Sequence, residues 1–300
     1  MISEELLKRL ETQFGSSAKV LAGFRAAKDR RPSFRANLLK SDDASVLAAL
    51  REDNVMFERA KAVPHAFFAR NRTDRELLEH PLNQEGKIYL QGIASMLPAL
   101  VLDPKREEAV LDLCAAPGSK TSQMAAMMGG GTLVACEDDS VRFQKLQNTL
   151  RIQGATFVEA VNKDATVLHH ERPEAFDKIL ADVPCSAEGR MDLSDPRSYR
   201  YWSQKNVNEH AKLQRRLLRS AARMLKPGGT LVYSTCTLAP EENEGQVEWL
   251  LAECPELVSE TFDLPVSEVK RWPKGGVTVL PTKDYEGFFI AKFKKTAASQ

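Results

Sequence analysis

The chain has 300 residues, of which 43% are hydrophobic and 28% are charged, and its formal net charge is +1, all ordinary values for a globular protein. A chain of this length can bury most of its apolar surface without disulfides or metals, and its longest apolar run, residues 93–102, is too short to span a membrane and contains Pro98. These values exclude membrane-spanning, collagen-like, disordered and small disulfide-rich proteins.

Residues 1–85 predict a small α+β domain. The expected elements are helices over residues 3–14 and 16–30, a strand at 33–38, a helix over 42–52 and further strands at 55–57 and 66–69. Residues 70–84 are polar and contain Pro81, which is typical of a linker.

From residue 86 to residue 295 the pattern changes to short β-type runs that alternate with helical patterns. The expected strands lie at 109–113, 131–137, 155–160, 175–182 and 230–235, and the expected helices at 119–128, 140–152, 207–225 and 241–252. This alternation indicates βαβ crossovers in a doubly wound, mostly parallel sheet. Residues 277–280 and 287–293 predict a final antiparallel pair at the sheet edge, and residues 296–300 form a tail.

Small and acidic residues follow the expected strands, at the edge where open α/β sheets bind ligands. The segment 114–121 opens a helix whose N-terminus favours an anion, but it lacks the glycines of a dinucleotide site, which argues against a nicotinamide dehydrogenase. Glu137 stands nineteen residues after Gly118, a spacing common for an acid that binds ribose, and Asp164 and Asp182 stand at the next strand ends. The set suits a ligand with ribose, an adenine amine and a positive charge, and S-adenosylmethionine fits that description.

The five cysteines form no CxxC pair, and their spacing is not that of metal ligands. With few histidines present, we expect no metal site and reduced thiols in a cytoplasmic protein. Cys185 and Cys236 follow neighbouring strands, so both should lie at the ligand-binding edge. A free thiol is roughly a few per cent thiolate at pH 7, so a nucleophilic role needs a nearby positive charge, for which Lys120 is one candidate.

Two basic runs raise nucleic acid as a partner. Residues 19–40 carry seven basic and one acidic residue, and residues 188–226 carry ten and four, so each run has a net charge of +6. The second run contains Tyr199, Tyr201 and Trp202, which can either stack on bases or anchor the core. Solvated helix faces are the alternative interpretation of both runs.

Several segments together resemble the RsmB/RsmF/NSUN family of RNA cytosine-5 methyltransferases. They are FRANLLKSD at 34–42, YLQGIASMLPAL at 89–100, LDLCAAPGSKT at 111–121, ADVPCSAEG at 181–189, LKPGGTLVYSTCTLAPEENE at 225–244 and GFFIAKFKK at 287–295. The resemblance covers roughly residues 31–295. It implies a Rossmann-like class I methyltransferase sheet, doubly wound with an antiparallel edge, and a small α+β N-terminal domain that targets RNA. The family motif often has a second glycine where Ser119 stands, which is a mild departure.

The resemblance also implies roles for single residues. Cys236 matches the nucleophile that adds to carbon 6 of cytosine, Cys185 the residue that helps release the product, and Asp182 the acid that holds or protonates ring nitrogen 3. Lys120 matches a lysine beside these groups. The matching cofactor contacts are Cys114, Ala115, Ala116, Pro117, Gly118, Ser119, Lys120, Glu137, Asp164 and Asp182.

The expected function is therefore methyl transfer from S-adenosylmethionine to carbon 5 of a cytosine in rRNA or tRNA, through a covalent cysteine adduct, by a monomer. One alternative is a DNA cytosine-5 methyltransferase, in which Cys185 would attack; the additional Cys236 argues against it. Another is a non-catalytic RNA-binding factor of ribosome assembly; the presence of Cys236, Cys185, Asp182 and Lys120 argues against that.

Overall fold

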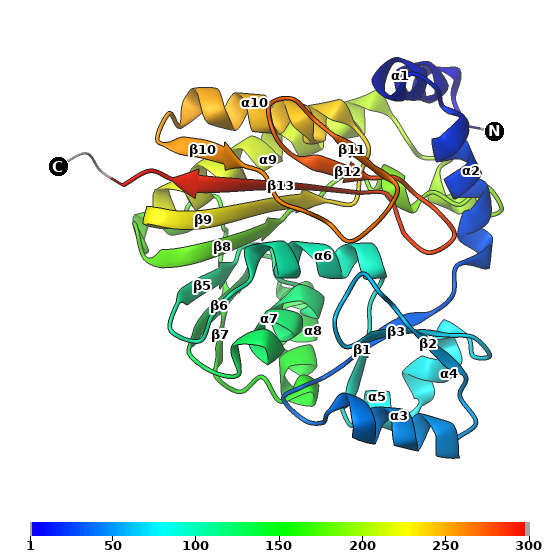
Figure 1. The fold of residues 1–300 in the computed structure, drawn as a ribbon. Helices are drawn as coiled ribbons and strands as arrows, with labels where there is room; N and C mark the ends of the chain where they lie inside the picture. The colour runs from blue at the N-terminus through cyan, green and yellow to red at the C-terminus, as the bar shows by residue number, and fades with distance from the viewer. Residues whose placement is uncertain (1, 298–300) are drawn as a thin grey trace.

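The structure is a computed structural model that describes residues 2–297, and it contains a small sheet and a large sheet (Figure 1). Of the tail expected at 296–300, residues 298–300 lie outside the described residues. The small sheet is antiparallel, with the order β2-β3-β1-β4. Its strands are β1 (Ser33–Ala36), β2 (Phe57–Arg59), β3 (Ala66–Ala69) and β4 (Ile88–Leu90), and its helices are α3 (Asp43–Glu52), α4 (Asp74–Glu79) and α5 (Pro81–Gln84).

The expected linker at residues 70–84 is wrong, because this segment folds into α4 and α5. Thr73 and Glu76 form a capping box in which each side chain accepts the other residue's backbone N–H. Pro81 is the first residue of α5, where a backbone N–H would have no helical partner. The helices are too short for a helical period to be visible. The domain boundary after residue 85 stays a prediction; β4, which follows it, belongs to the small sheet.

Helices α1 (Glu4–Phe14) and α2 (Ala18–Ala26), with the 3-10 turn η1 (Ala27–Asp29), lie away from the small sheet (Figure 1). They pack on the loops of the large sheet. The shared cluster contains Leu6, Leu10, Val20, Phe24, Met191 and Leu238, with Tyr199 and Trp202 packed against it. The first 30 residues therefore contact the large sheet instead of the rest of the expected N-terminal domain.

The large sheet has the order β11-β12-β13-β9-β8-β5-β6-β7. Its strands are β5 (Ala109–Asp112), β6 (Thr132–Glu137), β7 (Val158–Asn162), β8 (Phe176–Asp182), β9 (Leu225–Thr235), β10 (Leu257–Glu260), β11 (Val269–Arg271), β12 (Val277–Val279) and β13 (Phe288–Lys295). Strands β5 to β9 are parallel, and β13 runs antiparallel to β9. The expected antiparallel pair is confirmed as β12 and β13, although β13 lies inside the sheet because β10 and β12 both pair with its far side. The doubly wound class I fold is confirmed.

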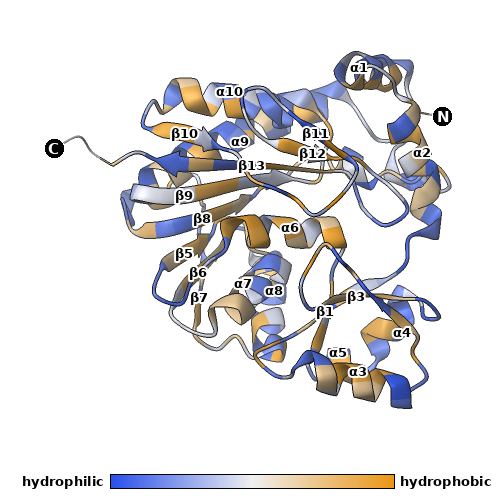
Figure 2. Cartoon of the chain, viewed as in Figure 1, coloured by the Kyte–Doolittle hydropathy of each residue, from blue (hydrophilic) through white to orange (hydrophobic). Residues whose placement is uncertain are grey.

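Helices cover both faces of the large sheet (Figures 1 and 2). On one face are α6 (Ile93–Leu102), α7 (Ser119–Met128) and α8 (Ser140–Gln153), and on the other are α9 (Gln204–Met224) and α10 (Glu244–Glu253). Neighbouring residues of a strand face opposite layers, so Val110 packs in the first and Leu111 in the second. No helix among residues 2–297 is long and apolar enough to cross a membrane.

Candidate active site

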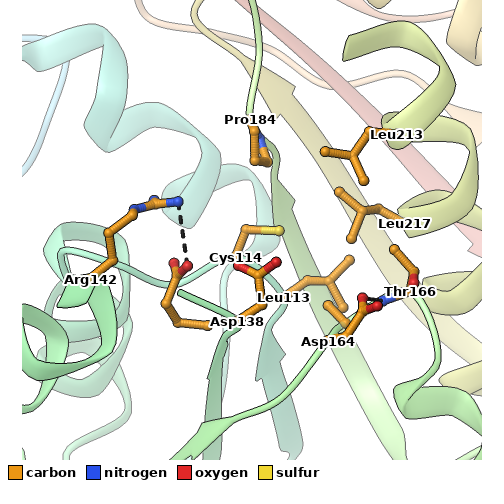
Figure 3. A pocket seen from close by; sticks show the side chains of 11 residues that line it. Leu113, Cys114, Asp138, Arg142, Asp164, Thr166, Pro184, Leu213 and Leu217 are labelled. Carbon is orange, nitrogen blue, oxygen red and sulfur yellow. Dashed lines mark hydrogen bonds and ion pairs between the residues drawn. The ribbon is translucent and has the colours of Figure 1, made fainter. Parts of the chain in front are cut away.

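Two adjoining cavities lie where the parallel strands end. We call them the acidic slot and the cysteine cavity, and they share Cys114 and Arg142 in their walls. The acidic slot is lined by side chains that follow β5, β6 and β7 and by Leu213 and Leu217 of α9 (Figure 3). The cysteine cavity has a volume of about 410 Å³, and Cys236 lies in its wall.

Glu137, at the end of β6, fixes the turn after β5 on one side of the acidic slot. Its side chain is 3% exposed, and burial raises the pKa of its carboxyl. The N–H groups of Ala116 and Asp139 donate to its two oxygens at 3.3 and 3.2 Å. Arg142 donates to the Ala116 carbonyl at 2.9 Å and lies 3.4 Å from the Glu137 carboxylate. The turn and the acid are therefore held together as one unit.

Asp164 stands on the opposite side of the slot, after β7. One of its oxygens accepts the Thr166 N–H at 2.8 Å, which orients the carboxylate. Leu213 and Leu217 supply an apolar wall beside it, as Figure 3 shows. An apolar wall beside an oriented acid suits a flat heterocycle that carries an amine.

The turn from Cys114 to Lys120 leads into α7. All its residues except Gly118 line a cavity; Gly118 has φ 104°, and a Cβ there would lie 3.0 Å from Thr149, so the glycine lets the turn pack on α8. Below the turn, Thr121 donates to one oxygen of Asp112 at 2.7 Å. The other oxygen is buried without a hydrogen-bond partner among the described residues, and burial raises the pKa of Asp112 to about 7.

The two cysteines meet in the cysteine cavity. Strands β8 and β9 are parallel neighbours, and their following loops bring Cys185 Sγ within 3.3 Å of Cys236 Sγ. The hydrogen bond to Cys236, followed by burial, raises the pKa of Cys185 well above the ordinary value of a thiol. Cys185 therefore keeps its proton at neutral pH.

Asp182 and Lys120 form an ion pair beside the thiols. Lys120 Nζ lies 2.6 Å from one Asp182 oxygen and donates to Ser95 Oγ at 2.8 Å, and Ser234 donates to the other Asp182 oxygen at 2.7 Å. The positive charge of Lys120 is therefore paired with Asp182. A positive charge that stabilises a thiolate in this cavity would have to come from another residue.

Glu242 is a buried acid that the sequence analysis missed. It lies in the 3-10 turn η5 (Pro240–Glu242) and accepts the Ser186 N–H at 3.0 Å and the Gln214 amide at 2.8 Å. Burial raises the pKa of Glu242 to about 7. Ser186 follows Cys185, and its hydroxyl is 2.7 Å from that of Thr237, which follows Cys236, so this network joins the two cysteine loops. The only sequence signal was its place six residues after Cys236.

Arg190 and Glu286 also line the cysteine cavity and were not predicted. Arg190 ends the 3-10 turn η3 (Glu188–Arg190), and its Nε lies 3.5 Å from Glu286 Oε2. Neither residue lies at the end of a parallel strand, so the argument from strand ends could not find them.

Each basic run contains cations with partners inside the molecule and cations that are exposed. In the first, Arg30 donates to the Thr282 carbonyl at 3.2 Å, Arg31 pairs with Glu58 and Asp284, and Arg35 is 3% exposed. The exposed cations of that run are Lys19, Arg25, Lys28 and Lys40. In the second run the exposed cations of α9 are Lys205, Lys212, Arg215, Arg216 and Arg223. Tyr199 and Trp202 are core anchors on α1 and α2, whereas Tyr201 is 75% exposed.

Comparison with known proteins gives consistent matches. Residues 99–294 match the family described as 16S rRNA methyltransferase RsmB/F. The ribosomal RNA small subunit methyltransferase F of Cronobacter sakazakii is 39% identical over 89% of this chain, which spans 58% of that relative. A methyltransferase homologue from Pyrococcus horikoshii matches with a TM-score of 0.78 at 30% identity, over 98% of this chain and 100% of its own. NSun6 from the same organism, crystallised with SFG, has the same fold, with a TM-score of 0.83 at 22% identity over 98% of both chains.

Proposed function

The chain belongs to the RsmB/F family of 16S rRNA methyltransferases, and from this premise we propose that it transfers a methyl group from S-adenosylmethionine to carbon 5 of a cytosine in ribosomal RNA, through a covalent adduct on Cys236. The observation that carries the proposal is the pair of thiols, Cys185 and Cys236, 3.3 Å apart beside Asp182. Since the chain spans 58% of the relative from Cronobacter sakazakii, the activity and the ribosomal substrate are both part of the proposal.

The acidic slot and the adjoining part of the cysteine cavity together fit S-adenosylmethionine by the chemistry of their side chains. In the slot, Glu137 suits the ribose hydroxyls and Asp164 suits the adenine amine. In the wall of the cysteine cavity, the unpartnered oxygen of Asp112 suits the ammonium group, and the first turn of α7 suits the carboxylate. When bound, the cofactor supplies an electrophilic methyl group.

Cys236 begins the reaction. Its thiolate adds to carbon 6 of the cytosine, and the ring electrons shift towards carbon 5 and ring nitrogen 3. The target base must leave its stack to reach this cavity, which costs about a few kcal/mol. Asp182, held by Lys120 and Ser234, stabilises or protonates ring nitrogen 3 as charge develops there.

Cys185 acts in product release. After methyl transfer, the proton on carbon 5 passes to a water molecule, the ring double bond re-forms, and the bond between carbon 6 and the Cys236 sulfur breaks, which returns Cys236 as a thiolate. Because Cys185 keeps its proton and lies 3.3 Å from Cys236, its thiol can donate a hydrogen bond to the departing sulfur. This hydrogen bond lowers the barrier to release.

Transfer of labelled methyl from S-adenosylmethionine to 16S rRNA, followed by bisulfite sequencing, tests the proposal. We expect label at one or a few cytosines with the unmodified chain and none with Cys236→Ala. The same assay is run with transfer RNA as the acceptor, and label in transfer RNA alone would reject the ribosomal substrate. Label at another base, or no label in either RNA, would reject cytosine-5 transfer by this chain.

A further inference from the structure

Arg190 lies close to Cys236 because backbone hydrogen bonds hold its segment there. The Gly189 N–H donates to the Cys236 carbonyl at 3.0 Å, and the Gly287 N–H donates to the Gly189 carbonyl at 2.9 Å. These bonds place Arg190 and Glu286 side by side in the wall of the cysteine cavity.

The turn that bears Arg190 is anchored from its other end. Glu188 is 1% exposed, forms an ion pair with Arg9 of α1 and accepts the Trp202 indole N–H at 2.6 Å. A close backbone contact explains why the next residue is glycine, since a Cβ on Gly189 would lie 2.0 Å from the Gly287 carbonyl. Arg190 is therefore carried by a fixed turn, although its own side chain is 62% exposed.

The charged groups around Cys236 come from several elements. The titratable and charged groups that line the cavity or contact the cysteine loops are Tyr89, Asp112, Cys114, Lys120, Arg142, Asp182, Cys185, Arg190, Glu242 and Glu286. Lys120 pairs with Asp182 at 2.6 Å, and Arg142 is bonded to the Ala116 carbonyl and lies 3.4 Å from Glu137. Both cations are therefore largely balanced by other partners.

Arg190 differs from these two cations in its pairing. Among the described residues its guanidinium is within hydrogen-bonding geometry of no acceptor, and its ion pair is with Glu286 at 3.5 Å, whereas Lys120 and Arg142 each donate a hydrogen bond. The Glu286 carboxylate is the main cause that raises the pKa of Arg190, and Arg190 and Cys236 line the same cavity. A guanidinium stays charged across the physiological pH range, and a nearby cation favours a thiolate over a thiol.

We propose that Arg190 is a positioning residue that holds Cys236 as a thiolate and that Glu286 opposes it, so the balance between the two side chains sets the reactivity of the nucleophile. This inference rests on the proposed function only in taking Cys236 as the attacking group. Entry of the base removes water from the cavity, and the attraction between guanidinium and thiolate is stronger where water is excluded.

Alkylation of Cys236 by iodoacetamide tests the proposal in the full chain without RNA or cofactor. Peptide mass spectrometry separates Cys236 from Cys185, and rates are followed from pH 6 to 9. Arg190→Met should lower the Cys236 rate at pH 7 by about 3- to 10-fold, since loss of a close cation changes the thiolate fraction by roughly that factor. Glu286→Gln should raise it by about 2- to 5-fold by the same reasoning.

Two further variants keep the test decisive. Arg197→Met removes an exposed arginine of the same segment, which pairs with Asp195, and should leave the Cys236 rate unchanged. Arg190→Lys retains the charge and should keep at least half of the original rate. If Arg190→Met fails to fold, Arg190→Gln removes the same charge with a polar side chain and should lower the Cys236 rate by the same factor.

Equal rates in the unmodified chain and Arg190→Met, or a change of the same sign in Arg190→Met and Glu286→Gln, would overturn the inference. A failure of the proposed function would give a different result from a failure of this inference. A chain that methylates no RNA yet shows the predicted alkylation pattern would reject the reaction while supporting the role of Arg190.

Discussion

The acidic slot and the cysteine cavity share Cys114 and Arg142, yet they are held together in different ways. In the slot, backbone N–H groups from the strand-end turns hold the acids, as the Ala116 N–H holds Glu137. In the cavity, side chains from other segments hold the reactive groups, as Lys120 of α7 holds Asp182 of β8. The slot therefore depends on the turns that follow the strands, and the cysteine pair depends on side-chain contacts between segments. We expect changes at the slot acids to alter cofactor affinity and changes at the cysteine pair to alter the chemical steps.

The largest effect should come from Cys236→Ala, the strongest test of this division. Without the thiol no adduct can start, so methyl transfer to RNA should fall below detection in a filter-binding assay. Affinity for S-adenosylmethionine, measured by calorimetry, should stay within about twofold of the original, because the substitution adds no charge and Cys236 does not line the slot. A parallel loss of cofactor binding would show that the two cavities act as one.

Cys185→Ala should separate attack from release within the cysteine cavity. The variant should still attack the base but release the product slowly, so a protein–RNA complex should survive denaturing electrophoresis. We expect turnover to fall by roughly 10- to 100-fold, since a hydrogen bond to a charged group contributes about 1.5–3 kcal/mol. A trapped complex with Cys236→Ala and none with Cys185→Ala would instead support attack by Cys185, as in DNA methyltransferases.

Asp164→Ala should act on the slot alone. Loss of a hydrogen bond to a charged group costs about 1.5–3 kcal/mol, so cofactor affinity should weaken by roughly 10- to 100-fold. RNA affinity, measured by gel shift without cofactor, should not change. Asp164→Asn, which keeps the acceptor that the Thr166 N–H uses, is the matched control and should lose less. Equal losses of cofactor and RNA binding would remove the distinction between slot and cavity.

The smallest expected effect is a pH dependence of cofactor affinity. Burial raises the pKa of Asp112 to about 7, so its carboxylate forms, and attracts the cofactor's ammonium, as the pH rises from 6 to 8. Affinity should increase several-fold over that interval.

In the free protein the same raised pKa of Asp112 has the opposite consequence, because it lowers the free energy of unfolding as the pH rises. The folded state retains a proton that the unfolded chain releases above about pH 4, so the free energy of unfolding should fall from that pH towards 7.

Calorimetry at three pH values with Asp112→Asn as the control measures this effect. That variant should bind more weakly throughout and with a flatter profile. Since burial also raises the pKa of Glu137, Glu137→Gln shows how much of the slope belongs to that neighbour. An unchanged slope in Asp112→Asn would assign the titration elsewhere.

The sequence predicted the site residues whose position follows from the order of the strands, and it missed the site residues whose position depends on tertiary packing. Cys185 and Cys236 were placed together because the carboxyl ends of parallel neighbours meet at one edge of a sheet. Their roles stay a prediction. Glu242 and Arg190 were missed although they follow Cys236 and Cys185 closely in the chain, because they lie in 3-10 turns beyond the strand ends, and only the folded turns bring their side chains back to the cysteine loops. For the basic run at 19–40, a count of charges did not say which cations have partners inside the molecule: Arg30 and Arg31 have them, whereas Arg25 and Lys28 are exposed.

Arg35 links the small sheet to the large one. From β1 it donates to Gln91 at 3.1 Å and to Ser122 of α7 at 2.7 Å, although burial lowers the pKa of this guanidinium to about 10. Removing the partners of Arg35 would leave a buried charge unpaired, so these contacts tie the small sheet to α7, the helix that begins beside the cysteine cavity. For an RNA bound to the small sheet, this connection would set the distance from its binding surface to Cys236, and so which cytosine along the strand reaches the thiol.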